Sequence, residues 1–129
     1  MGNPQLPRPT DAELAILGVL WQLGPSTVRQ VHDALSREQP TGYTTVLKFM
    51  QIMAEKGLLD RDESQRAHVY SPRVSEQKTQ RQLVTDLLDR AFSGSAAKLV
   101  VQALSSKKAS RDEIDEIRNL LDQIEGGTR

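Results

Sequence analysis

The sequence predicts a mainly α-helical chain with one small β-hairpin, and three observations support this class. The 129 residues are 37% hydrophobic and include no Cys, so the chain should fold around an apolar core without disulfides. The first half alternates helical apolar stripes with capping residues, and one short stretch after residue 57 has the character of a hairpin. The rest of the chain is helical in pattern.

The first helix is predicted by its start and stop signals. Thr10-Asp11-Ala12-Glu13 forms a capping box, in which the Thr10 side chain accepts from a backbone amide and Glu13 reaches back to another. An apolar stripe follows at helical spacing, and Gly24-Pro25 supplies the stop. The stripe consists of Leu14, Leu17 and Trp21.

A second, shorter helix follows at once. Ser26 or Thr27 is the expected cap, and the helix should end near Ser36. Its core side is expected to carry Val28, Val31 and Leu35. The segment Gln39-Pro40-Thr41-Gly42 is typical of a turn.

The third helix, from Tyr43 to Lys56 and closed by Gly57, carries the most information. Successive residues advance by about 100° around a helix, so its two faces can be separated. The apolar face contains Val46, Leu47, Met50, Met53 and Ala54. The opposite face is mostly small or polar and contains Thr44, Thr45, Lys48, Ile52 and Glu55.

The hairpin is predicted from Leu58 to Asp62 and from Ala67 to Ser71, with Pro72 as its end. Three helices followed by a hairpin within about 65 residues is the order of a winged helix-turn-helix. We therefore expect a winged-helix DNA-binding domain over residues 1–73.

The remaining chain, residues 74–129, is expected to form a helical dimerisation domain. Its three helices carry apolar arcs that are too wide for short helices to cover among themselves, so a second copy of the chain is the simplest cover. The alternative is that the tail folds back on the N-terminal domain. The residues expected at the dimer interface are Leu87, Leu88, Val100, Leu104, Ile117, Leu121 and Ile124.

Charge and composition exclude several classes of function. The 17 basic and 17 acidic residues cancel, so DNA binding must depend on local placement of charge. His32 and His68 are the only histidines, and with no Cys we expect no metal site and no cofactor. No nucleophile, base and orienting group can be assembled, so an enzyme is not expected. With neither a membrane span nor a signal peptide in the pattern, a cytoplasmic protein is expected.

Five motifs together resemble the penicillinase-repressor family (BlaI/MecI, with the copper repressor CopY). They lie at residues 10–14 with Leu20-Trp21, and at 27–31, 43–46, 55–59 and 67–70. The resemblance implies a homodimeric bacterial transcriptional repressor whose partner is double-stranded DNA. It also implies that the third helix enters the major groove of the operator.

Two branches of the family are regulated by features that differ here. The copper-responsive branch binds metal through C-terminal cysteines, which this chain lacks. Another branch is released by a regulatory protease, and for this chain release by a protease, a ligand or another partner stays open. That protease cuts an Asn-Phe bond, whereas the aligned pair here is Gln102-Ala103.

The residues expected to contact DNA are Thr44, Thr45, Lys48, Ile52 and Arg66. Lys48 can donate to guanine or to a phosphate, and Ile52 can pack on a thymine methyl. Many relatives carry Arg at the position of Ile52. The alternative to the thymine contact is that Ile52 packs on Tyr43 or on the wing. Replacing that thymine with uracil, which lacks the methyl, should weaken binding if the methyl contact exists. Arg66, at the hairpin tip, can reach a phosphate or the minor groove, or can simply be solvated.

Two functions follow from these features. The first is a homodimeric repressor that binds a palindromic operator through the third helix and the wing. The second is a winged-helix module that binds a protein and has no sequence-specific DNA binding, since the net charge of zero does not require DNA. Affinity for DNA falls steeply with salt when phosphates are neutralised, so salt dependence separates the two.

Overall fold

The computed structural model describes residues 8–106 and 108–127. Its internal contacts divide the chain into two compact units between Leu83 and Val84, within helix α4 (Glu76–Ala91). The domain boundary expected between residues 73 and 74 stays a prediction. The two units are described separately below.

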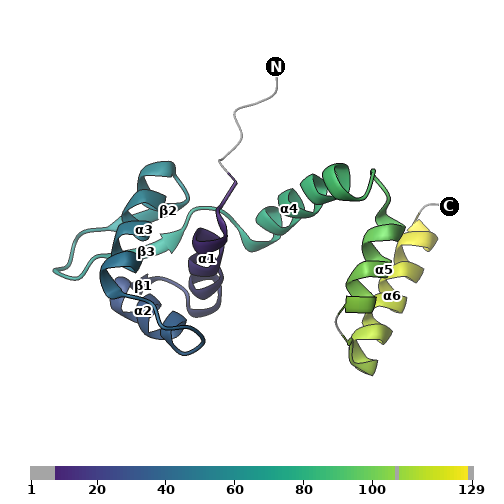
Figure 1. The fold of residues 1–129 in the computed structure, drawn as a ribbon, viewed down its shortest axis with the longest axis horizontal. Helices are drawn as coiled ribbons and strands as arrows, with labels where there is room; N and C mark the ends of the chain where they lie inside the picture. The colour runs from purple at the N-terminus through teal and green to yellow at the C-terminus, as the bar shows by residue number, and fades with distance from the viewer. Residues whose placement is uncertain (1–7, 107, 128–129) are drawn as a thin grey trace, which may run out of the picture. The chain divides into compact units, whose positions relative to one another are not determined.

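Besides the first part of α4, the first unit contains three helices and three short strands, coloured purple to teal in Figure 1. In chain order these are α1 (Asp11–Leu23), β1 (Ser26–Thr27), α2 (Val28–Ser36), α3 (Tyr43–Lys56), β2 (Leu59–Asp62) and β3 (Val69–Pro72). The fold class expected from the sequence, mainly helical with a small wing, is confirmed.

Caps fix where the first two helices begin. The Thr10 hydroxyl accepts from the Glu13 amide at 3.2 Å, while the Glu13 carboxylate accepts from the Thr10 amide at 3.0 Å. Thr27, not Ser26, caps α2 and forms the same reciprocal pair with Gln30. Because both boxes are readable in the sequence, both helix starts were predictable.

The core of the first unit is formed by apolar side chains from every one of its helices and from its sheet. The buried members are Ile16, Leu17, Leu20, Val28, Val31, Val46, Met50, Met53, Leu58, Leu59 and Tyr70. Of the expected stripe of α1, Leu17 is buried, Trp21 is half-buried and packs against the core, and Leu14 is half-buried. The Trp21 indole donates to the Val74 carbonyl at 3.0 Å, so this side chain lies at the edge of the core.

The sheet has three strands, in the order β1-β3-β2, rather than the two of the expected hairpin. The hairpin itself is antiparallel, with Arg61 opposite Tyr70 and Asp62 opposite Val69. Strand β1 adds Ser26 and Thr27 against Tyr70 and Val69. A strand of two residues carries no periodic pattern, which is why β1 could not be predicted from the sequence.

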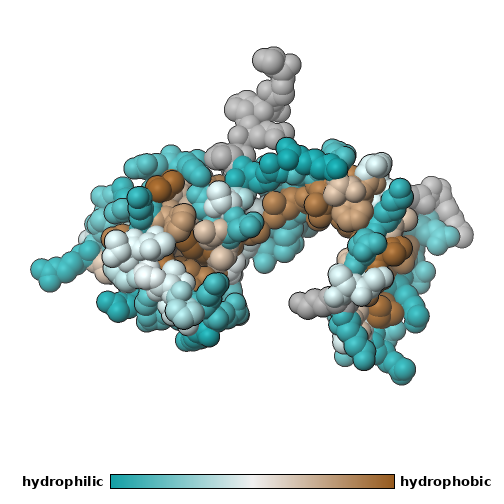
Figure 2. Space-filling view, viewed as in Figure 1, coloured by the Kyte–Doolittle hydropathy of each residue, from teal (hydrophilic) through white to brown (hydrophobic). Residues whose placement is uncertain are grey.

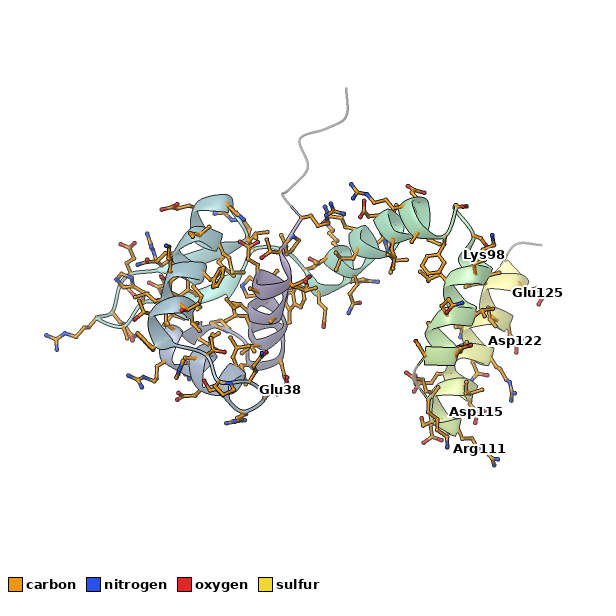
Figure 3. All side chains as sticks on the ribbon, viewed as in Figure 1. Glu38, Lys98, Arg111, Asp115, Asp122 and Glu125 are labelled. Atoms are coloured by element: carbon orange, nitrogen blue, oxygen red, sulfur yellow. The ribbon has the colours of Figure 1, made fainter. Side chains whose placement is uncertain are left out.

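The second unit contains the end of α4, α5 (Ala96–Ser106) and α6 (Arg111–Gly127). Ser95 and Ser110 cap the last two helices, each accepting at 3.1 Å from the amide three residues on. Ser93-Gly94-Ser95 lies between α4 and α5, and Ser110 directly precedes α6. Charged side chains lie along α6, and Figure 3 labels four of them, Arg111, Asp115, Asp122 and Glu125.

No residue between Val84 and Gly127, among those described, is buried. Hydrophobic side chains of this unit are instead open to solvent, and Figure 2 shows them on α4, α5 and α6. The large apolar residues that are 40% to 58% exposed are Val84, Leu87, Val100, Val101, Leu104, Leu120, Leu121 and Ile124. In a single chain, this unit therefore has no apolar core of its own.

Candidate nucleic-acid interface

Helix α3 presents one face to the core and the opposite face to solvent. Val46, Met50 and Met53 are buried, while Thr44, Thr45 and Lys48 are exposed. This separation follows the helical spacing of apolar residues in the sequence. The exposed face therefore carries two hydroxyls and an ammonium group, which can donate hydrogen bonds to bases or phosphates.

The first turn of α3 is open to a ligand. Its N-cap is Gly42, and no side chain caps the helix there. The first amides of a helix have no partner inside the helix, and the helix dipole adds partial positive charge at this end. The amides next to Thr44 and Thr45 are therefore suited to a phosphate oxygen.

Ile52 is half-buried and lies outside the set of apolar side chains that pack on the core. Its exposed part leaves room for an apolar contact. The alternative is that Ile52 packs on Tyr43 or on the wing. The position of Ile52 on α3 does not decide between this packing and a contact with DNA. The thymine contact of Ile52 stays a prediction.

The wing carries Arg66 on the exposed loop between β2 and β3. The Asp62 carboxylate accepts from the Ser64 amide at 2.9 Å, and the hydrogen bonds from Ser64 hold the pKa of Asp62 below its ordinary value. A hydrogen bond with Tyr70, together with Glu63 at 2.8 Å, raises the pKa of Arg61. The base of the loop is thus ordered by polar contacts, and Arg66 lies beyond it.

Several cations of this unit are already paired with carboxylates. Lys56 Nζ lies 2.8 Å from Glu13 Oε2, and Arg73 lies 2.7 Å from Asp60. Among the described residues, by contrast, no carboxylate forms an ion pair with Lys48 or Arg66. These two cations therefore keep their charge available to a polyanion.

The pair between Glu13 and Lys56 joins the start of α1 to the end of α3. Glu13 is 2% exposed, and burial alone would raise its pKa. The hydrogen bond from Lys56, the bonds from Thr10 and the charge of Lys56 outweigh burial, so the pKa of Glu13 is lowered from 4.5. Sequence reasoning assigned Glu13 only a capping role and did not predict its pairing with Lys56.

Sequence reasoning also missed a cluster at the other end of α3. The Arg29 guanidinium lies 5.0 Å from the centre of the Tyr43 ring, and His32 meets the same ring edge-on at 5.8 Å. The only signal in the sequence is the i, i+3 spacing of Arg29 and His32, which puts them on one face of α2. Nothing in that spacing identifies Tyr43 as their partner.

Comparison with known proteins gives this surface a context. The penicillinase repressor family model matches residues 9–123. The chain belongs to the penicillinase repressor family. The resemblance inferred from the motifs is thereby confirmed, and the family consists of DNA-binding transcriptional repressors rather than enzymes.

Individual relatives match nearly the whole chain. A transcriptional regulator BlaI of Mycobacterium tuberculosis is 36% identical over 125 residues, which cover 95% of this chain and 89% of the relative. The penicillinase repressor of Bacillus licheniformis is 24% identical, with 92% and 93% covered. The methicillin resistance regulatory protein MecI of Staphylococcus aureus is 19% identical, with 88% and 93% covered.

Two solved structures match the winged part. The DNA-binding domain of the repressor BlaI in solution is 26% identical with a TM-score of 0.51, covering 57% of this chain and 90% of that one. The Bacillus licheniformis BlaI monomer in complex with the blaP half-operator is 26% identical with a TM-score of 0.50, covering 57% and 89%. Within the described part of this chain, no helix has both the length and the apolar character that a membrane crossing requires.

Proposed function

We propose that this repressor acts as a homodimer that binds an inverted-repeat operator through α3 and the wing. The observation that carries the proposal is the exposed face of α3, where Thr44, Thr45 and the unpaired Lys48 lie beside an uncapped helix start. Ile52 and Arg66 complete the proposed contact surface. That the similar BlaI monomer is known with a half-operator supports DNA as the ligand of this surface.

The second unit supports the dimer. Its exposed apolar residues have no cover within the unit itself, and a stable homodimer interface buries on the order of 2,000 Å² of mainly apolar surface. We place Leu87, Leu88, Val100, Leu104, Ile117, Leu121 and Ile124 in that interface. Two reading helices related by a two-fold axis would then meet half-sites about 34 Å apart, or a multiple of that distance.

Location and release follow from the same proposal. A repressor that binds chromosomal DNA acts in the cytoplasm, where that DNA is. A regulatory protease is the partner that would end repression by separating the two copies. Gln102-Ala103 lies inside α5, so cleavage there would require local unfolding of the helix.

The test is binding of the full chain to a duplex that it selects from a random-sequence library, against a scrambled duplex of equal composition. We expect a clear preference for the selected duplex, and affinity should fall with salt with a log-log slope of about −0.9 per phosphate neutralised. Fluorescence anisotropy at several salt concentrations measures both. Weak binding without salt dependence and without preference would instead support the protein-interaction module.

A further inference from the structure

Helix α3 differs from the two helices before it in how its start is fixed. Helices α1 and α2 each begin with a reciprocal capping box formed by their own residues, whereas Gly42 offers α3 no side chain. The first turn of α3 therefore has no capping side chain to hold it. Contacts from α2 reach this turn instead.

The first contact joins His32 to the turn before α3. His32 Nε2 lies 2.8 Å from the carbonyl oxygen of Thr41, which lies two residues before the start of the helix. A carbonyl oxygen only accepts, so Nε2 carries the hydrogen of this bond. At the other edge of the ring, Nδ1 lies 3.1 Å from the Asp33 carboxylate.

The second contact holds the first residue of α3. The Tyr43 ring is 40% exposed, so core packing does not fix it. Instead, the Arg29 guanidinium lies over the ring at 5.0 Å, and His32 meets it at an interplanar angle of 64°. Arg29 and His32 therefore contact both Tyr43 and the turn before it, and these residues form one cluster.

We propose that Arg29 and His32 are positioning residues for operator recognition, acting through Tyr43 and Thr41 on the first turn of α3. This inference rests on the proposed function. Thr44 and Thr45 follow Tyr43 directly, so a shift of the turn would move their hydroxyls and the open amides. Such a shift would weaken base and phosphate contacts that need a fixed geometry, whereas non-specific attraction to phosphates would be unchanged.

The experiment compares variants of the full chain on the selected and the scrambled duplex. His32→Leu removes the donor to Thr41, and Arg29→Ala removes the cation over Tyr43. We expect each to lower affinity for the selected duplex by about five- to tenfold and to leave the scrambled duplex within about twofold. Arg37→Ala, which removes an equal charge at the other end of α2, is the matched control and should bind as wild type.

Two further measurements separate positioning from other roles. His32→Gln keeps a donor and should recover most of the lost affinity, which a purely steric role of the ring would not allow. For Arg29→Ala the salt slope should stay unchanged, because a guanidinium that contacts a phosphate itself would reduce the slope by about 0.9. Thermal unfolding of each variant, followed by circular dichroism, identifies any that does not fold, and the folded variants then decide.

Distinct results overturn the inference and the proposed function. If wild type prefers the selected duplex but His32→Leu and Arg29→Ala bind it equally well, the positioning role is wrong while the repressor function stands. An equal loss on both duplexes with a reduced slope would make Arg29 a direct phosphate contact instead. If wild type itself shows no preference, the proposed function fails, and the positioning role with it.

Discussion

At the scale of single residues, neighbouring carboxylates decide which cations can serve DNA binding. Lys56, Arg61 and Arg73 each lie within 2.8 Å of a carboxylate oxygen, whereas Lys48 has no such partner among the described residues. A cation that is already paired gains little from a phosphate, because it must first leave its partner. Lys48 is thus the cation of α3 with the most to gain from an operator.

Replacing Lys48 tests this at one position. We expect Lys48→Ala to weaken binding to the selected duplex by about 1 to 3 kcal/mol, the value of one good base contact, and to leave the dimer intact. Lys98→Ala is the matched control, because it removes an equal charge from an exposed position of α5. Equal binding by the two variants in an anisotropy titration would remove Lys48 from the interface.

At the scale of elements, helix α3 is tied to the rest of its unit at both ends. Lys56, its last residue, contacts the buried Glu13 of α1, and the turn before its first residue contacts His32 of α2. Glu13 is also the capping residue of α1, so one side chain connects two helices. Replacing Lys56 would leave the buried Glu13 carboxylate without one of its hydrogen-bond donors.

We therefore expect Lys56→Met to lower the free energy of unfolding by about 1 to 3 kcal/mol near neutral pH. Lys48→Met, the same change on the exposed side of α3, should cost much less. Since folding lowers the pKa of Glu13, the contribution of the pair is fully present above the ordinary value of 4.5 and is lost as the pH falls through the lowered value. Urea denaturation at neutral and acid pH measures the difference, and a pH-independent cost would refute the ion pair.

At the scale of the whole molecule, the two units differ in the burial of their apolar side chains. The first unit buries apolar side chains from all its helices, while the second leaves its large apolar residues open in a single chain. An apolar face of this size favours association with another such face. We therefore expect the proposed dimer to depend on the second unit, and operator affinity to depend on the dimer because two half-sites must be held together.

Replacing two leucines of similar exposure, one in each unit, tests whether the second unit forms the dimer interface. Leu121 is 58% exposed in the second unit and Leu23 is 54% exposed in the first. We expect Leu121→Ala to weaken the dimer by about 2 to 5 kcal/mol, as for a buried leucine, and to lower operator affinity with it. Leu23→Ala should leave sedimentation unchanged. A Leu121→Ala protein as dimeric as Leu23→Ala would exclude this face from the interface.

The sequence by itself determined the order of the helices and the place of the hairpin. Capping boxes, apolar stripes and glycine stops are local signals, so α3 begins at Tyr43 and ends at Lys56 as expected, and the exposed face of that helix follows from its periodicity. The family resemblance was also readable in short motifs. These features depend on residues a few positions apart.

The tertiary structure alone decided which distant residues meet. The contact of Lys56 with Glu13 spans 43 positions, that of Trp21 with Val74 spans 53, and β1 exists only because β3 lies beside it. Likewise, Arg29 and His32 find Tyr43 only across the turn between α2 and α3. The physical reason is that a local pattern fixes which face of an element is apolar, whereas its partners depend on how the whole chain packs.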